Sequence, residues 1–401
     1  MDPLTSISIV LLAMLAGIYL KQGLGTTLLY GVILTSALFG GLSSLPADTV
    51  EALTSWETIS LILLVYLVFF LNNLLSATGA MKKVVESIEN MITDPRAIMA
   101  LIPAIIGLMP VLSGAVISAP FADELGKKTG TNKEKRHVVN YWFRHISEYV
   151  NPVYPGVLLA TGMLGLSFTT FLKANLPVMA FYALIGVAYL LYTIKKPKTR
   201  PKSLRTKDLT VVASGVAPIA VAVLLPVLLN IELYLSISAA VAVAYALNPK
   251  AKKNTKKIAA ESLKPDLTAI VCLVMLFKTV LTNTQATTKI SASLLTAGIP
   301  ATALLIILPM MMGFLTGLTI GYVGLTFPLI MPLLIVGGEP QLHAITLAYV
   351  SGYVGLLASP IHLCFSVTQK YFNADTRGIY RMLLPPLFLT FIWALLYATV
   401  L

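Results

Sequence analysis

The strongest constraint on the fold of this chain is an apolar segment that occurs twice, each time interrupted near its middle by glycine and small polar residues. The first copy reads IPAIIGLMPVLSGAVISAP from Ile102, and the second reads LPMMMGFLTGLTIGYVGLTFP from Leu308. Corresponding residues lie 206 or 208 positions apart, and Asn151-Pro152 has Ser359-Pro360 as its counterpart at the same spacing. The nearly constant spacing indicates a duplicated unit. Interrupted apolar segments at matching places in two halves are typical of transporter binding sites.

The composition indicates a membrane protein. The chain is 57% apolar, and only 11% of its residues are charged, against about 25% in soluble domains. No basic region or cleavage pattern follows Met1, so we expect no removable signal peptide. Cys272 and Cys364 lie inside apolar runs and indicate neither a disulfide framework nor a metal site.

Ten apolar stretches are near the ~20 residues needed to cross a bilayer, so we predict an all-α polytopic membrane protein. The two interrupted segments, about 96–126 and 300–336, are either kinked crossings or re-entrant helical hairpins. The expected crossings are about 5–20, 24–42, 57–78, 138–165, 174–193, 209–229, 233–247, 266–284, 343–369 and 379–400, with breaks in 138–165 and 343–369.

The distribution of charge favours hairpins. With the N-terminus outside and both interrupted segments re-entrant, most of the 29 lysines and arginines lie in cytoplasmic loops, as the positive-inside rule requires. A single crossing at either segment places basic loops on the wrong side. Five crossings per unit is an odd number, so the second unit runs inverted relative to the first.

These arguments divide the chain into two inverted-topology repeats in the plasma membrane. We predict a first repeat at 1–193, a basic cytoplasmic linker at 194–208 and a second repeat at 209–401, with both termini outside. The apolar residues of 81–92 share one helical face, which is typical of an interfacial helix or of an amphipathic connector. The net charge of +12 follows from this topology and suits contact with the lipid bilayer. The basic residues lack interleaved aromatics, so no nucleic acid is expected as a partner.

This arrangement resembles the ion transporter superfamily, which includes citrate, gluconate and dicarboxylate carriers. Within it the chain is most similar to an uncharacterised prokaryotic family, the domain-of-unknown-function family 401. The resemblance implies a homodimer in which a mobile domain moves elevator-fashion against a static scaffold. The Ser-Asn-Thr motif of the superfamily's hairpin tips is replaced here by Leu112-Ser113-Gly114 and Leu318-Thr319-Ile320, so the resemblance concerns the fold and not the substrate.

Candidate substrate-binding residues cluster at the four interruptions. Helix N-termini at such breaks carry free N–H donors and a partial positive charge of about +0.5, which suits an anion, whereas the helix C-termini present carbonyls that suit Na⁺. The alternative is a set of kinks needed only for helix packing. The candidates are Ser113, Gly114, Asn151, Pro152, Thr316, Gly317, Thr319, Ser359 and Pro360.

Ionisable residues inside the membrane are rare and usually functional. Arg144 and Glu148 share a helical face, and His145 lies beside them, directly before a break. We expect Glu148 or His145 to bind the driving proton, with Arg144 holding the substrate or Glu148. The alternative is a structural ion pair.

Lys278 and Asn72 lie 206 positions apart and are further candidates for substrate binding. A lysine that reaches the outer surface is an equally good interpretation of Lys278. We expect His362 to be a hydrogen-bonded core histidine more than a ligand.

We therefore expect a secondary active transporter for a small organic anion, coupled to H⁺ or Na⁺. A cation/proton antiporter of the same fold, with Glu148 as its exchange site, is the alternative. A membrane-embedded enzyme is less favoured, because the chain carries no zinc-protease motif or nucleophile elbow. A channel is less favoured, because two hairpins that each enter and leave on one side argue against an open pore. Neither a cofactor nor a metal centre is expected, apart from Na⁺ at the hairpin tips and helix breaks.

Overall fold

The computed structural model describes residues 2–109, 114–195, 205–298 and 300–401. Apart from one antiparallel pair of two-residue strands, its regular structure is helical, which confirms the predicted all-α fold class. The first half contains α1 (Pro3–Tyr19), α2 (Leu24–Thr35), α3 (Leu45–Thr54), α4 (Trp56–Thr78), α5 (Ala80–Met91), α6 (Pro95–Ile106), α7 (Gly114–Lys128), α8 (Lys133–Arg144), α9 (Pro155–Leu164) and α10 (Phe168–Ile185).

The second half follows after the linker. Its short antiparallel strands β1 (Ile335–Val336) and β2 (Glu339–Pro340) close the connection between α17 and α18. The helices are α11 (Thr206–Leu229), α12 (Leu233–Leu247), α13 (Thr255–Ser262), α14 (Pro265–Asn283), α15 (Ala286–Thr296), α16 (Ala301–Thr316), α17 (Thr319–Leu334), α18 (Leu342–Ala358), α19 (Leu363–Phe372) and α20 (Thr376–Ala398).

Six helical spans among the described residues are long and apolar enough to cross a membrane, and a seventh is added if the bent pair of α2 and α3 counts as one. Two helices that the sequence marked as crossings, α1 and α12, are shorter, with 17 and 15 residues. The number of ten crossings therefore stays a prediction. The six spans are Trp56–Thr78, Phe168–Leu191, Thr206–Leu229, Pro265–Asn283, Leu342–Phe372 and Thr376–Ala398.

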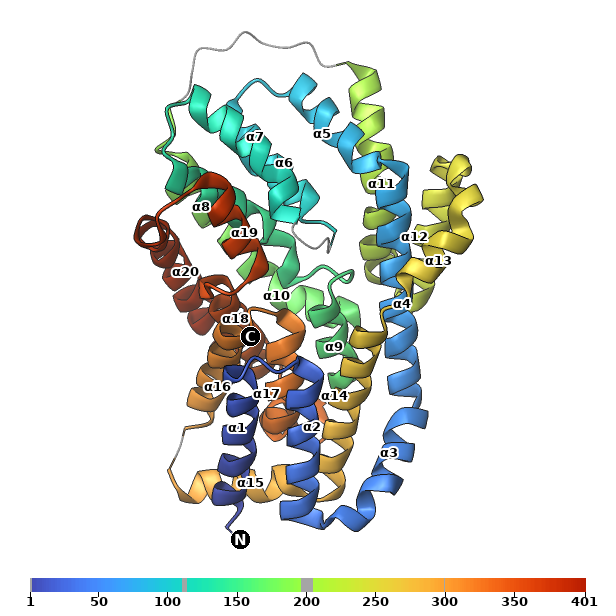
Figure 1. Cartoon of the computed structure of the whole chain (residues 1–401), viewed down its shortest axis with the longest axis vertical. Coiled ribbons are helices and arrows are strands. Elements are labelled where there is room, and N and C mark those ends of the chain that lie inside the picture. The colour runs from blue at the N-terminus through green and yellow to red at the C-terminus, as the bar shows by residue number, and fades with distance from the viewer. Residues whose placement is uncertain (1, 110–113, 196–204, 299) are drawn as a thin grey trace.

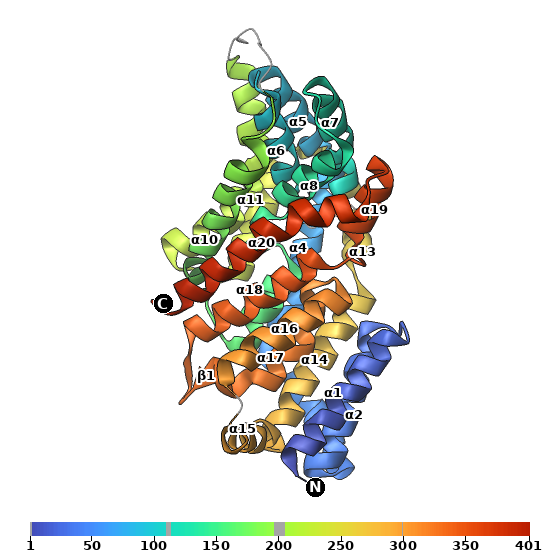
Figure 2. The same ribbon diagram turned by 90° about the vertical axis from the view of Figure 1, so that its left-hand side faces the viewer.

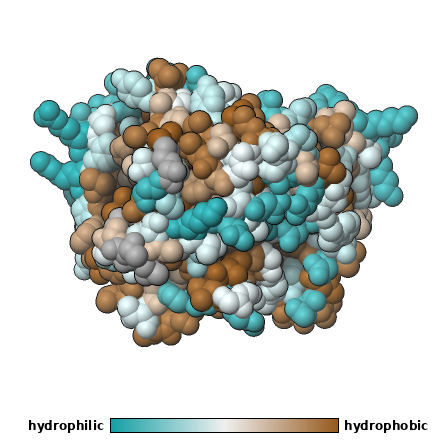
Figure 3. Space-filling model, turned by 90° about the horizontal axis from the view of Figure 1, so that it is seen from below, coloured by the Kyte–Doolittle hydropathy of each residue, from teal (hydrophilic) through white to brown (hydrophobic). Residues whose placement is uncertain are grey.

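The outward faces of several helices carry large apolar side chains. Leu184 on α10, Leu228 on α11 and Phe388 on α20 are each more than 60% exposed. Hydrophobic areas also lie beside hydrophilic ones on the face seen in Figure 3. Extended exposed apolar surface of this kind marks contact with lipid, so the fold is that of a multi-pass membrane protein.

The two interrupted segments are helix–turn–helix units at different levels of the molecule. Figures 1 and 2 show α6 and α7 near one end of the long axis and α16 and α17 nearer the other, with α8, α18 and α19 between them. The turn from α16 to α17 is formed by Gly317, whose left-handed backbone ends α16 at little steric cost. The first interruption is predicted from Pro110 to Gly114, and its residues 110–113 lie outside the described residues, as does most of the linker.

No crossing or hairpin predicted from the sequence includes α3, α13 or α15. All three are short, with 10, 8 and 11 residues. The segment at 81–92 is a helix of its own, α5, whose residues Val84, Val85 and Ile88 are buried. It packs against α11, so its apolar face is covered by protein and the prediction of an amphipathic connector fits it better than that of an interfacial helix.

Candidate functional site

Each hairpin lies against a broken helix through a glycine. An ideal Cβ at Gly107, which follows α6, would stand 2.0 Å from the carbonyl oxygen of Arg144. An ideal Cβ at Gly313, in α16, would stand 2.0 Å from the carbonyl oxygen of Gly352 in α18. Only glycine lets the two backbones approach so closely. The two contacts recur at the spacings of the sequence pattern, 206 residues between the glycines and 208 between the carbonyls.

Side chains at the two breaks donate hydrogen bonds to the hairpins, again in matching positions. Asn151 Nδ2 donates to the carbonyl oxygen of Leu108 at 2.9 Å, and Ser359 Oγ donates to that of Phe314 at 2.6 Å. A helix that is interrupted inside a membrane must satisfy its freed backbone groups within the protein. These two polar residues therefore join each broken helix to the end of its hairpin.

A second matching pair acts one turn further on. The hydroxyl of Tyr154 donates to the carbonyl oxygen of Gly107 at 2.7 Å. His362, 208 positions later, is hydrogen-bonded through Nδ1 to the carbonyl oxygen of Gly317 at 2.7 Å. Each hairpin end is thus held by two side chains from its broken helix.

The break after α8 results from its local sequence. The α-helix ends at Arg144, a 3₁₀ turn covers Ile146–Tyr149, and Pro152 and Pro155 follow. Proline has no N–H to continue the helical hydrogen bonds, so several carbonyls are left without helical partners. Tyrosines of α18 supply these partners, because Tyr353 donates to the carbonyl of His145 at 2.8 Å and Tyr349 donates to that of Glu148 at 3.1 Å.

A buried ion pair lies at the centre of these contacts. Arg144 Nη1 donates to Glu148 Oε1 at 2.7 Å and lies 3.2 Å from the hydroxyl of Tyr154. The two charged side chains are 3% and 7% exposed. Among the residues that the structure describes, Arg144 is the only buried lysine or arginine. A buried pair is weak evidence for stability, since its desolvation opposes its Coulomb attraction, and the coupling role and the structural ion pair both stay predictions.

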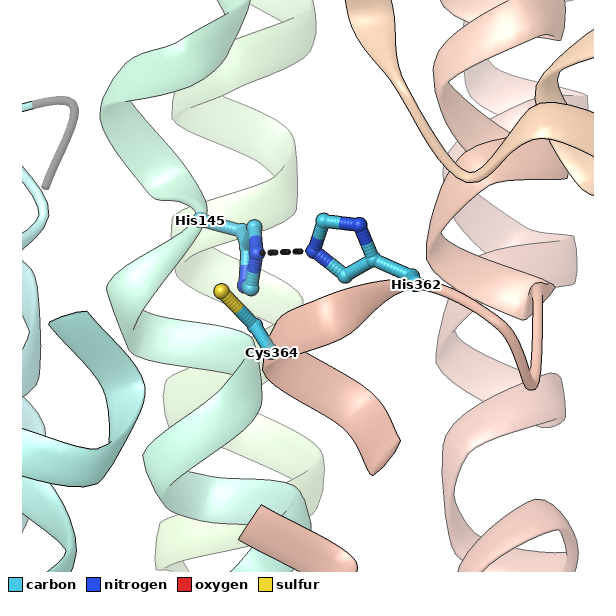
Figure 4. Close-up of side chains that lie close together, drawn as sticks. All are labelled: His145, His362 and Cys364. Carbon is cyan, nitrogen blue, oxygen red and sulfur yellow. Dashed lines mark hydrogen bonds between the residues drawn. The ribbon is translucent and has the colours of Figure 1, made fainter. Parts of the chain in front are cut away.

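His145 and His362 meet beside this ion pair. Their Nε2 atoms are 3.0 Å apart, and His145 Nε2 is 3.9 Å from Glu148 Oε1. Figure 4 shows the two rings pointing toward one another from the end of α8 and the start of α19, with Cys364 at their side. One ring nitrogen of each histidine and the sulfur of Cys364 all lie within 4.8 Å of one another.

The α16–α17 hairpin also contacts the opposite half. A Cβ at Gly156, the second residue of α9, would stand 2.5 Å from the Cβ of Thr319, the first residue of α17. Within the first half, a Cβ at Gly114, the first residue of α7, would stand 3.2 Å from Nε and Nη2 of the Arg144 guanidinium. The start of α7 therefore borders Arg144, and the start of α17 borders α9.

We call the buried cluster of Arg144, His145, Glu148 and His362 the central group. Several predicted site residues lie close to its members in the chain. Asn151 and Ser359 are buried and point their polar atoms at the hairpins. Pro152 is buried, whereas Pro360 is exposed. The Thr316 hydroxyl donates to the carbonyl of Met312 within its own helix. Ser113 lies outside the described residues.

The structure does not bring Lys278 to the central group. Its Nζ donates to Glu57 Oε2 at 2.7 Å, at the start of α4, and the Glu57 side chain is 55% exposed. The interpretation of Lys278 as a lysine reaching the surface therefore fits its position, and substrate binding does not. Its counterpart Asn72 is buried on α4, and its Nδ2 has no hydrogen-bond partner among the described residues.

The prediction that His362 is a hydrogen-bonded core histidine fits its position, because it is buried and contacts both Gly317 and His145. Sequence reasoning overlooked the tyrosines at positions 154, 349 and 353. A signal was present, because Tyr154 and His362 keep the spacing of 208 residues that identified Asn151 and Ser359. A comparison of the two halves at every residue type, and not only at Gly, Pro and Asn, would have paired Tyr154 with His362.

Comparison with known families identifies the chain. The model of a family described as "Protein of unknown function (DUF401)" matches residues 5–401. The chain belongs to this family. The similarity predicted from the sequence is thereby confirmed at the level of the family, while membership of the wider ion transporter superfamily stays a prediction. None of the curated proteins matches this DUF401 chain.

Among solved structures, this DUF401 protein is similar to the YdaH transporter of Alcanivorax borkumensis, whose crystal structure is described as having an unusual topology. The TM-score is 0.62, the sequence identity is 13%, and the alignment covers 90% of this chain and 88% of that one. At this identity the similarity shows a shared fold.

Proposed function

We propose that this DUF401 protein is a secondary active transporter that moves a small organic anion, such as a carboxylate, across the plasma membrane with H⁺ or Na⁺ as the coupling ion. The observation that carries the proposal is the buried Arg144–Glu148 pair beside His145 and His362, with a hairpin bound at each of the two helix breaks. Small hydroxyl and amide groups, helix N-termini and one guanidinium make a site that favours a single negative charge.

Arg144 is the group most suited to hold the anion. A guanidinium presents a planar set of donors that matches a carboxylate, and the interaction is strong when water is excluded. Glu148 occupies one edge of the guanidinium through Nη1. In the proposed cycle the substrate carboxylate takes the place of Glu148 or binds beside it, next to Gly114 at the start of α7, where an added Cβ would stand 3.2 Å from the guanidinium.

We propose an elevator-type motion in a homodimer, as the resemblance implies. The close backbone contacts at Gly107 and Gly313 tie each hairpin to its broken helix. Elements joined in this way move as one body, and the site is carried with them. The proposal also includes the predicted topology, namely two inverted repeats, extracellular termini and a cytoplasmic linker.

Ligand-dependent thermal stability tests the proposal. Purified protein is heated with a panel of small carboxylates and sugar acids, with and without Na⁺, at two pH values. A ligand at 100 times its Kd stabilises the folded form by about 2.7 kcal/mol. We expect stabilisation by one carboxylate class, enhanced by Na⁺ or by acid. The variant Arg144→Lys keeps the charge but loses the planar donor set, so it should lose this stabilisation.

The matched control is Lys278→Met, which removes a basic residue that lies away from the central group and should keep the ligand response. Stabilisation by Na⁺ or Li⁺ alone, without any anion effect, would favour the cation/proton antiporter of the same fold. An anion response that survives Arg144→Lys and disappears in Lys278→Met would refute the assigned binding site.

A further inference from the structure

The hydrogen bonds around the two histidines fix where their ring protons lie. His145 Nδ1 is 2.6 Å from the carbonyl oxygen of Tyr141, and His362 Nδ1 is 2.7 Å from that of Gly317. A carbonyl oxygen only accepts, so each Nδ1 carries a hydrogen and donates it. A neutral imidazole has one N–H, which leaves a lone pair on Nε2 of both rings.

The two Nε2 atoms nevertheless face one another at 3.0 Å. Two lone pairs at this distance repel one another, and the repulsion is strong in a buried site of low dielectric constant. One additional proton turns the contact into an N–H···N hydrogen bond of ordinary length. A zinc ion bound tetrahedrally by two imidazoles, at about 2.0–2.1 Å from each, would hold the nitrogens roughly 3.3 Å apart, so the observed distance fits a proton better.

We propose that His145 and His362 form a proton-binding site in which one proton is shared between their Nε2 atoms. Both side chains are buried, His145 completely. The sharing needs no movement, because each ring is already held at Nδ1 by a backbone carbonyl.

The neighbouring titratable and charged groups set the charge of the site. On the His145 side they are Tyr141, whose ring centroid is 4.5 Å from that of His145, and the Arg144–Glu148 pair. From the opposite half they are Tyr353, which donates to the His145 carbonyl, and Cys364. Arg144 and Glu148 cancel one another, so the shared proton gives the site one net positive charge, which a bound anion would neutralise.

The proton would also control a contact between the two halves of the chain. His145 directly follows α8 in the first half. His362 directly precedes α19 and is hydrogen-bonded to Gly317 at the turn of the α16–α17 hairpin. Removing the proton restores the repulsion and favours separation of the two rings. The site thereby links proton occupancy to the position of this hairpin. This coupling role rests on the transport function proposed above, whereas the shared proton itself does not.

Nuclear magnetic resonance of protein labelled with ¹⁵N-histidine tests the shared proton directly. The chain has four histidines, at positions 137, 145, 343 and 362. We expect a ¹⁵N–¹⁵N scalar coupling across the hydrogen bond between two Nε2 atoms in the unmodified protein. His145→Gln and His362→Gln should each abolish it, whereas His343→Gln, a change at an exposed position, should leave it intact.

Absence of this coupling in the unmodified protein, with all four rings behaving as independent imidazoles, would overturn the proposal. So would a pair of signals that changes when a strong chelator is added, because that result indicates a bound metal ion. The scalar coupling is measured without any transport, so the shared proton and the transport function are tested separately. Scalar coupling without anion binding or flux supports the proton site and contradicts the transporter. Anion flux without scalar coupling supports the transporter and contradicts the proton site.

Discussion

A single methyl group at Gly313 should separate α16 from α18. The added carbon would stand 2.0 Å from the carbonyl oxygen of Gly352, and a Cβ contact below 3.0 Å is essentially never found. The obstructing atom belongs to the backbone, so no change of rotamer relieves the contact. The two helices must therefore move apart by at least about 1 Å, a displacement that close-packed interiors resist.

The cost of this displacement can be estimated from the structure. Overpacking of a well-packed core typically costs 1–3 kcal/mol, and a contact between two backbones belongs near ~3 kcal/mol of that range. A shift of this size also stretches the 2.6 Å hydrogen bond from Ser359 to Phe314 to about 3.6 Å, beyond hydrogen-bonding distance. Its loss adds about 1 kcal/mol. Gly313→Ala should thus lower the free energy of unfolding by roughly 4 kcal/mol in total.

Thermal unfolding of the purified variant in detergent, with size-exclusion chromatography of the unheated sample, measures this effect. Gly107→Ala should behave like Gly313→Ala, since its Cβ would meet the Arg144 carbonyl at the same 2.0 Å. The control is Gly25→Ala on α2, where the nearest atom to the new Cβ is a Leu273 methyl carbon at 3.6 Å. If Gly313→Ala unfolds at the same temperature as the control, the helices do not pack as described.

Further predictions concern the site and the topology. Glu148→Gln should abolish the pH dependence of anion uptake into proteoliposomes if Glu148 takes part in proton coupling, and an unchanged profile removes it from that role. Glu148→Ala should cost about 3–5 kcal/mol of stability by leaving Arg144 without its carboxylate, and thermal unfolding that matches the unmodified protein would show the pair to be dispensable. Gly114→Val should abolish uptake, because its Cβ would stand 3.2 Å from the Arg144 guanidinium; normal uptake would place the substrate elsewhere. Single cysteines placed in 195–207, in a background lacking the two native cysteines, should react with an impermeant maleimide only from the cytoplasmic side, and labelling from outside would overturn the topology.

The pattern of the sequence was sufficient for the principal helices. Proline and glycine at 103, 107, 309 and 313 helped to identify the repeat spacing, and the predicted ranges for α4, α11, α12 and α14 agree with the structure to within a few residues. Long apolar runs are informative because the bilayer fixes the length of a crossing. The short helices α3, α13 and α15 have no such requirement and were not predicted.

The candidate site was only partly predictable. The 206- and 208-residue spacings identified Asn151 and Ser359, whose hydrogen bonds to the hairpins are local consequences of a helix break. They did not indicate that Lys278 pairs with Glu57, because that partner lies 221 residues away on α4. A charged side chain in an apolar run gives no information about which helix faces it.

The sequence by itself therefore determined the class of protein, the main helices and the positions of the breaks, since these depend on composition and on residues near one another in the chain. Only the tertiary structure brought His145 within 3.0 Å of His362, a residue 217 positions away. That contact depends on how α8 packs against α19, which is set by contacts between distant segments and not by any local pattern. The fold is thus evident from the order of the residues, whereas the proton-binding pair exists only once the two halves have packed together.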